Sequence, residues 1–284
     1  MSFTIGLIDY LNTQPFQYDL EARLVPKGVR FVRGVPTALN RALLAGEIDL
    51  APISAYFAAQ HADQFVILPG HSIASWGAVK TVLLFSWKPD IYELAGETIA
   101  LTDHSATSVA LLQALCRHRY HISPTMVTRP QHLPGMMREA AAALVIGDTA
   151  LVEGYLHREL ARDFSYGRPT IFDLGDEWLK LTGLPFVFAL WAARREAVPA
   201  LIELGILPAL AASKQAGLAH LPQIAASYAP TLALPAGVCV RYLRDLRYDL
   251  TASDLQGLST FLGMALPDFA PPQLQFLEEA VNPA

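Results

Sequence analysis

Residues 5–16 of the chain read Ile5-Gly6-Leu7-Ile8-Asp9-Tyr10-Leu11-Asn12-Thr13-Gln14-Pro15-Phe16. The apolar residues 3–8 predict a buried strand, and Pro15 is placed as in the first turn of a helix. Open α/β sheets bind ligands at the polar turns that follow their strands. Asn12 offers a donor and an acceptor at this turn, and Thr13 offers a hydroxyl. Both are therefore candidate ligand-binding residues; the alternative is that one of them only caps the helix.

The same order of strand and helix continues along the chain. Strands are predicted over residues 29–35 and 47–54, with a helix over residues 36–46 between them. This rhythm predicts a parallel sheet with helices on both faces. The strand over 47–54 would deliver Ser54 to the sheet edge that carries Asn12, so Ser54 is a further candidate for ligand binding.

A second α/β rhythm follows a strand over residues 65–69 and an irregular polar segment over 71–80. Strands are predicted over 98–102, 126–128, 143–147 and 170–174, and helices over 105–120, 135–143 and 176–181. The chain after Glu196 has a helical pattern and too little strand for a third α/β unit. The sequence therefore predicts two α/β units followed by a helical tail.

The tail would pack most easily onto the first unit. Domain 1 is then discontinuous, comprising residues 1–87 and 185–284, and domain 2 is inserted between them over residues 88–184. Two strands, over 81–87 and 184–191, are expected to cross between the lobes. Clefts between lobes are favoured ligand sites, so the polar strand ends of both units are expected to face one another there.

Length and composition agree with two domains. The 284 residues are 52% hydrophobic and 17% charged, with a mean hydropathy of +0.30 and a formal net charge of −5. No uncharged apolar run reaches the roughly 18 residues that a membrane span needs, and no secretory signal pattern opens the chain, so we expect a cytoplasmic protein. The negative net charge argues against a nucleic acid partner. Cys116 and Cys239 lack metal-ligand spacing and are expected in the core.

A polar segment in the second unit is a candidate anion site. Ser105, Thr107 and Ser108 stand at the predicted end of a strand and the start of a helix. The unpaired amides and the dipole of a helix N-terminus favour a carboxylate or a phosphate without any lysine. The alternative is an ordinary helix cap, which needs only one of the three side chains.

Asp148 follows another strand of the second unit and could bind a ligand hydroxyl, although a helix cap is the alternative. His71 and His104 are candidates for proton transfer, with simple exposure as the alternative. No metal-binding pattern, nucleophile elbow, phosphate loop or dinucleotide fingerprint is present, so no cofactor or metal is expected.

In combination, these segments resemble the menaquinone-pathway chorismate dehydratases. The resemblance covers nearly the whole chain, and its motifs lie at residues 5–6, 10–16, 46–54, 77–86, 105–112, 146–151, 178 and 182–191. It implies a two-lobed periplasmic-binding-protein type II-like fold. Three positions in two of these motifs depart from the pattern: Ala78 and Thr81 stand where Pro and Ser are expected, and Ala106 stands where an arginine is expected.

The resemblance also implies a reaction and a set of roles. Chorismate, a dianion, would lose water to give 3-[(1-carboxyvinyl)oxy]benzoate on the futalosine route to menaquinone. Asn12 would be catalytic, holding the enolpyruvyl carboxylate or the departing hydroxyl, and that carboxylate could itself take the proton. Thr107 and Ser108, with their helix amides, would bind one carboxylate, while Thr81 and Ser54 would make polar contacts from domain 1. Ser105 would be a further substrate-binding residue.

Two other interpretations compete with this one. A related enzyme of the same fold makes 1,4-dihydroxy-6-naphthoate, and the Tyr10-Leu11-Asn12-Thr13 start favours the dehydratase instead. A protein that only binds a small anion is the other; a solute receptor would need an export signal, and a regulator would need a DNA-binding segment before Phe3. The oligomeric state has no sequence signal.

Overall fold

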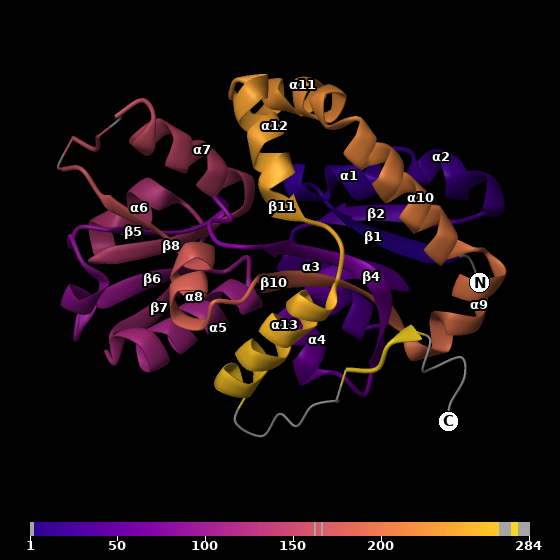
Figure 1. Cartoon of the computed structure of the whole chain (residues 1–284), viewed down its shortest axis with the longest axis horizontal. Helices are drawn as coiled ribbons and strands as arrows, with labels where there is room; N and C mark the ends of the chain where they lie inside the picture. The colour runs from indigo at the N-terminus through magenta and orange to yellow at the C-terminus, as the bar shows by residue number, and fades with distance from the viewer. Residues whose placement is uncertain (1–2, 162, 166, 267–273, 278–284) are drawn as a thin grey trace.

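The computed structural model describes residues 3–161, 163–165, 167–266 and 274–277. Within these residues the strands form two separate sheets, and helices cover the faces of both (Figure 1). We call the six-stranded sheet with its helices lobe 1 and the five-stranded sheet with its helices lobe 2. The predicted two-lobed α/β architecture is confirmed.

The lobe 1 sheet has the strand order β11-β4-β10-β3-β1-β2. β1 pairs in parallel with both β2 and β3, as the strand–helix–strand rhythm predicts, whereas β10 is antiparallel to β3 and β4. The sheet is therefore mixed, because β10 enters it from the opposite direction after the chain has built lobe 2. The strands are β1 Thr4–Ile8, β2 Arg30–Gly34, β3 Leu50–Ser54, β4 Phe65–Ser75, β10 Phe186–Arg194 and β11 Leu246–Arg247.

The lobe 2 sheet has the order β7-β6-β8-β5-β9. β6 is parallel to β7 and β8, and β5 is antiparallel to β8 and β9. The strands are β5 Val82–Ser86, β6 Thr98–Thr102, β7 Thr125–Arg129, β8 Ala142–Ile146 and β9 Thr170–Asp173.

The strands expected to cross between the lobes each belong to one sheet: β5 lies in lobe 2 and β10 in lobe 1. The short segments 76–81 and 183–185 make the connections instead. The irregular segment predicted over residues 71–80 is shorter in the structure, because strand β4 continues to Ser75. It does so since β10 pairs with it on one side and Leu246 of the distant strand β11 pairs with Ser75 on the other. The domain boundaries at residues 87 and 185 stay a prediction.

The helical tail packs on lobe 1. α10 lies against α1, where a side chain at Gly217 would come within 2.2 Å of the Pro15 carbonyl oxygen, so only glycine fits this contact. The helices are α1 Gln14–Gln17, α2 Leu20–Leu24, α3 Pro36–Leu44, α4 Ala55–Gln60, α5 Ala106–Leu115, α6 Leu133–Glu139, α7 Gly147–Arg158, α8 Leu174–Thr182, α9 Val198–Glu203, α10 Ile206–Ala219, α11 Leu221–Leu232, α12 Ala236–Asp245 and α13 Ala252–Ala265.

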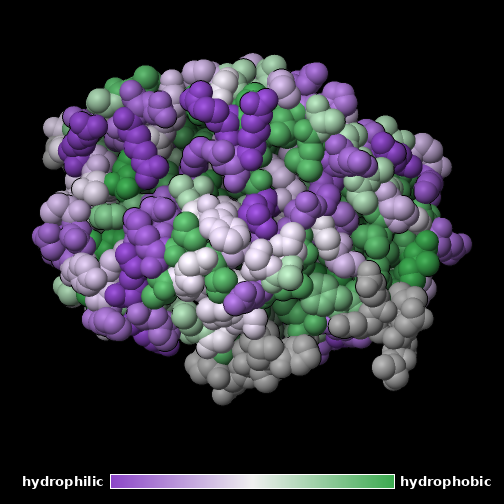
Figure 2. All heavy atoms as spheres, viewed as in Figure 1, coloured by the Kyte–Doolittle hydropathy of each residue, from purple (hydrophilic) through white to green (hydrophobic). Residues whose placement is uncertain are grey.

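The apolar residues fill the interior of both lobes, and many hydrophilic residues cover the face in Figure 2. Cys116 and Cys239 are buried and unpaired, as expected. Within the described part of the chain, no single helix has the length and apolar character to cross a membrane. One pair of helical segments, 195–203 and 206–219, meets those criteria only jointly and is bent by 73°.

Candidate functional site

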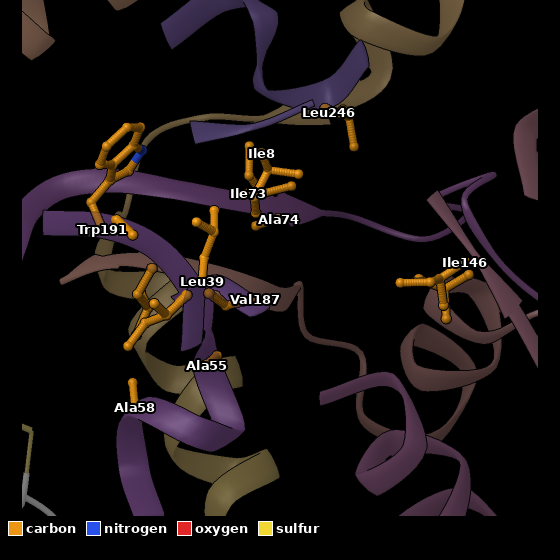
Figure 3. Packing of buried hydrophobic residues seen from close by; sticks show 14 of the residues in the cluster. Ile8, Leu39, Ala55, Ala58, Ile73, Ala74, Ile146, Val187, Trp191 and Leu246 are labelled. Atoms are coloured by element: carbon orange, nitrogen blue, oxygen red, sulfur yellow. The ribbon is translucent and has the colours of Figure 1, made fainter. Parts of the chain in front are cut away.

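A pocket lies between the two lobes and encloses an empty space of about 610 Å³, its open mouth included. Figure 3 shows Ile8 and Ile73 in lobe 1 and Ile146 apart from them in lobe 2; all three contribute to the pocket wall. The wall is made by residues of both sheets and of the segment that joins them: Ile8, Tyr10, Asn12, Thr13, Pro36, Ser54, Ile73, Val79, Thr81, Val82, Ser105, Ser108, Ile146, Gly147, Phe188 and Ala189.

None of these wall residues is an acid, a histidine, a lysine or an arginine. The wall instead includes the first residues of several helices. Pro36 begins α3, Gly147 begins α7, and Ser105 is the residue that caps α5; these helices have nine, twelve and ten residues. The dipole of a helix places partial positive charge at its N-terminus, which attracts an anion without a full charge. The pocket is therefore suited to an anionic ligand.

Asn12 projects into this pocket from a short 3-10 turn, Leu11–Thr13, directly after β1. Its Oδ1 atom is buried and has no hydrogen-bond partner among the described residues. A buried polar atom without a partner is costly, so this oxygen is available to a ligand. The Thr13 hydroxyl is used differently: it donates to the Ile8 carbonyl oxygen at 2.7 Å and holds the turn that presents Asn12.

Thr81 enters the pocket from the connection between β4 and β5. Its hydroxyl lies 3.1 Å from the hydroxyl of Tyr242 on α12, and its carbonyl oxygen accepts from Gly147 N at 2.9 Å. The buried carboxylate of Asp173 accepts from the amides of Val79 and Lys80, at 2.9 and 2.6 Å. Lys80 is held at a φ of 65°, which is strained for a residue with a side chain. Asp173 therefore shapes the turn that places Thr81.

Ser105 and Ser108 both line the pocket from the start of α5. The Ser105 hydroxyl oxygen accepts from Ser108 N at 3.0 Å, which is the expected helix cap, and its own proton goes to the Ser108 hydroxyl at 3.0 Å. The cap and the pocket position occur together, so the two interpretations of these serines do not exclude each other.

Thr107 is not part of the pocket wall. Its hydroxyl lies 2.5 Å from the Ser54 hydroxyl and accepts from Tyr56 N at 3.0 Å, and its amide donates to Ser54 Oγ at 3.1 Å. These contacts join the start of α5 in lobe 2 to the start of α4 in lobe 1. The hydroxyl and amide expected to bind a carboxylate are thus engaged between the lobes.

Asp148 is also absent from the pocket wall. Its carboxylate accepts from Leu11 N at 3.0 Å, which makes a second contact between the lobes. Burial raises the pKa of Asp148 to about 6, against the lowering effect of the bonds from Leu11 and Tyr228. Nearby, burial and then the charge of Asp148 raise the pKa of Tyr10 to about 12, so this pocket residue stays protonated near neutral pH.

Comparisons with known proteins show to which family the chain belongs. A model of the menaquinone biosynthesis family matches residues 3–266. The chain belongs to this family. A chorismate dehydratase from Thermus thermophilus is 35% identical over 276 residues, which cover 95% of this chain and 97% of that protein. The expected family resemblance is therefore confirmed.

Solved structures with less sequence similarity share the fold. Protein AF1704 from Archaeoglobus fulgidus has a TM-score of 0.72 at 19% identity and covers 93% of this chain and 96% of its own. The periplasmic aliphatic sulphonate binding protein SsuA from Escherichia coli has a TM-score of 0.63 at 19% identity, covering 93% and 85%. The periplasmic-binding-protein-like fold expected for this family is thus confirmed.

The structure brings together most of the predicted site residues and leaves others outside. Thr107 and Asp148 lie at contacts between the lobes, as described above. His71 is buried against the ring of Phe16 and does not line the pocket; burial lowers its pKa to about 4, so it is neutral at pH 7. His104 lies outside the pocket beside Asp103, 3.5 Å away. The six predicted residues that line the pocket are Asn12, Thr13, Ser54, Thr81, Ser105 and Ser108.

Three further residues shape the site but were not predicted from the sequence: Tyr10, Asp173 and Tyr242. Tyr10 stands within the opening motif, so its proximity to Asn12 was a usable signal. Asp173 and Tyr242 had none, because each acts on a segment more than 90 residues away in the sequence.

Proposed function

We propose that this protein eliminates water from chorismate to give 3-[(1-carboxyvinyl)oxy]benzoate, as a carbon–oxygen lyase of menaquinone biosynthesis by the futalosine route. The observation that carries the proposal is the unpartnered Oδ1 of Asn12 in an uncharged pocket to which helix N-termini contribute. The 35% identity to a chorismate dehydratase over nearly the whole chain supports the choice of substrate.

The pocket suits a dianion. Chorismate carries two carboxylates, and Ser105 and Ser108 at the start of α5 would bind one of them with hydroxyls and the helix dipole. Ser54 and Thr81 would contact the substrate from the other side. Thr107, whose predicted role was to bind a carboxylate, enters the proposal as the residue that holds Ser54 in place.

The reaction breaks the C3–H and C4–O bonds, and the C–H electrons form the new double bond of an aromatic ring. The C3 proton and the departing hydroxide leave together as water, so no electrons are gained or lost. Because the pocket wall contains no carboxylate, histidine or lysine, the substrate's enolpyruvyl carboxylate is the base in this proposal. Asn12 would accept from the C4 hydroxyl at Oδ1 or donate to that carboxylate from Nδ2, and the enzyme would act by positioning and by placing partial charges.

The proposal is tested by incubating the purified protein with chorismate, without added metal or cofactor, and separating the products by liquid chromatography with mass detection. Protein-dependent loss of chorismate matched by formation of the enolpyruvyl benzoate is the expected result. Binding of chorismate without conversion would instead support a protein that only binds small anions. Absence of both would overturn the substrate assignment. A cytoplasmic location and independence from cofactors remain predictions.

A further inference from the structure

Tyr242 lies where the helical tail meets both lobes. It stands on α12, which Figure 1 shows between the two sheets, and its side chain is only 1% exposed. The residue comes 161 positions after Thr81 in the sequence. A phenol that only filled space here could be replaced by phenylalanine, since burying a hydroxyl is unfavourable unless it is hydrogen-bonded. The contacts of the hydroxyl therefore indicate its purpose.

The Tyr242 hydroxyl is directed to pocket residues. It lies 3.1 Å from Thr81 Oγ1, and Thr81 lines the pocket. Burial raises the pKa of Tyr242 well above its usual range, while hydrogen bonding with Thr81 and with Asn12 lowers it in part. The phenol therefore keeps its proton near neutral pH and can donate it to Thr81 Oγ1.

We propose that Tyr242 is a positioning residue for the dehydration, orienting the hydroxyl of Thr81. The proposal rests on the function proposed above. When Tyr242 donates to Thr81 Oγ1, the single hydrogen of Thr81 is left for another acceptor. Its other acceptor, the Val79 carbonyl oxygen, is 3.4 Å away, which is long for a hydrogen bond between oxygens. The Thr81 hydroxyl can then donate to the C4 oxygen of the substrate as it departs.

Tyr248 provides a matched control. It is also a buried tyrosine, 4% exposed, but its hydroxyl has no hydrogen-bond partner among the described residues and it does not line the pocket. Its ring packs on Phe16. Tyr248→Phe therefore removes the same atom from the same core without touching Thr81 or Asn12.

The test measures kcat and KM for chorismate, with thermal stability, in the wild type, Tyr242→Phe and Tyr248→Phe. We expect Tyr242→Phe to lower kcat about tenfold or more with KM within about threefold, the effect of losing one hydrogen bond at the reacting group. Tyr248→Phe should leave kcat within about twofold. A kcat in Tyr242→Phe equal to that of the wild type, or an equal loss in both variants, would overturn the positioning role.

A second pair of variants separates positioning from general packing. If Tyr242 acts through Thr81, the double variant Thr81→Val with Tyr242→Phe should be no slower than Thr81→Val alone. Multiplying losses would mean that Tyr242 acts independently of Thr81 and would refute the proposal. A wild type that forms no product would overturn the proposed function, and this role with it; an active wild type with an unaffected Tyr242→Phe overturns only the role.

Discussion

The hydroxyl oxygens of Ser54 and Thr107 lie 2.5 Å apart, and this contact joins the start of α4 in lobe 1 to the start of α5 in lobe 2. Thr107 also accepts from Tyr56 N and donates its amide proton to Ser54, so three hydrogen bonds meet at one point. Both side chains are nearly fully buried. A second contact joins the lobes where Asp148 of α7 accepts from Leu11 N. Both contacts adjoin the pocket, because Ser54 takes part in the first and Gly147, which precedes Asp148, also lines the pocket.

The first prediction concerns Thr107. Thr107→Val keeps the shape of the side chain but removes the hydroxyl that links Ser54 and Tyr56, so the arrangement of the lobes around the substrate should weaken. We expect KM for chorismate to rise about tenfold, as befits the loss of two buried hydrogen bonds. Steady-state kinetics measure it. Thr128→Val, at an exposed position of β7, is the control and should leave KM unchanged. An unchanged KM in Thr107→Val would contradict this role.

The second prediction concerns pH. Burial raises the pKa of Asp148 from 3.8 to about 6, so the folded protein binds this proton more tightly than the unfolded chain does. The stability linked to the proton is complete below about pH 4 and is lost as pH rises through about 6. Asp148→Asn cannot ionise and should therefore be more stable than the wild type by about 1–3 kcal/mol above pH 6, with no difference near pH 4.

Urea unfolding of both proteins between pH 4 and 8 measures this difference. The side-chain amide oxygen that Asp148→Asn introduces could still accept from Leu11 N, which keeps the contact between the lobes. Asp103→Asn, at an exposed carboxylate, is the control. A stability difference that does not change with pH would show that the charge of Asp148 is not the cause.

The third prediction concerns Asp173. Its two oxygens accept from the amides of Val79, Lys80 and Gly175, and an asparagine offers only one oxygen for these donors. Asp173→Asn should lower the free energy of unfolding by about 2–4 kcal/mol because buried amides lose their partner. It should also reduce kcat, since the same turn places Thr81.

Asp90→Asn is the control for Asp173. Asp90 also caps a helical turn with its carboxylate, but on the surface, where it accepts from Tyr92 N at 3.0 Å. Its replacement should cost less than about 1 kcal/mol and leave kcat unchanged. Chemical denaturation and turnover assays on both variants decide the matter; equal effects would rule out a special role for the buried carboxylate.

Much of this arrangement could be predicted because it is local in sequence. Asn12 and Ser54 line the same pocket because β1 and β3 are neighbouring parallel strands whose ends share one edge of the sheet. Apolar periodicity in the sequence predicts such strands. The cap pattern likewise placed Ser105 and Ser108. The same pattern could not show that the Thr107 hydroxyl faces the other lobe, because a helix start looks alike whether it meets solvent, ligand or protein.

Long-range pairing explains the remaining differences. The continuation of β4 through His71 to Ser75 depends on β11, a two-residue strand in the distant tail. Tyr242 contacts the pocket residue Thr81 from a helix whose own sequence pattern indicates only packing. Such contacts are set by how the tail folds back on lobe 1, and no local segment encodes that.

The central claim, that an uncharged pocket organised by Asn12 dehydrates chorismate, is tested most directly by one comparison of initial rates. The rate of enolpyruvyl benzoate formation is measured for the wild type and for Asn12→Asp, with thermal unfolding as a check of the fold. We expect steady product formation by the wild type and none above background by Asn12→Asp, because a carboxylate at this position in the pocket repels the dianion. A wild type without product, or an Asn12→Asp variant of comparable rate, would contradict the claim.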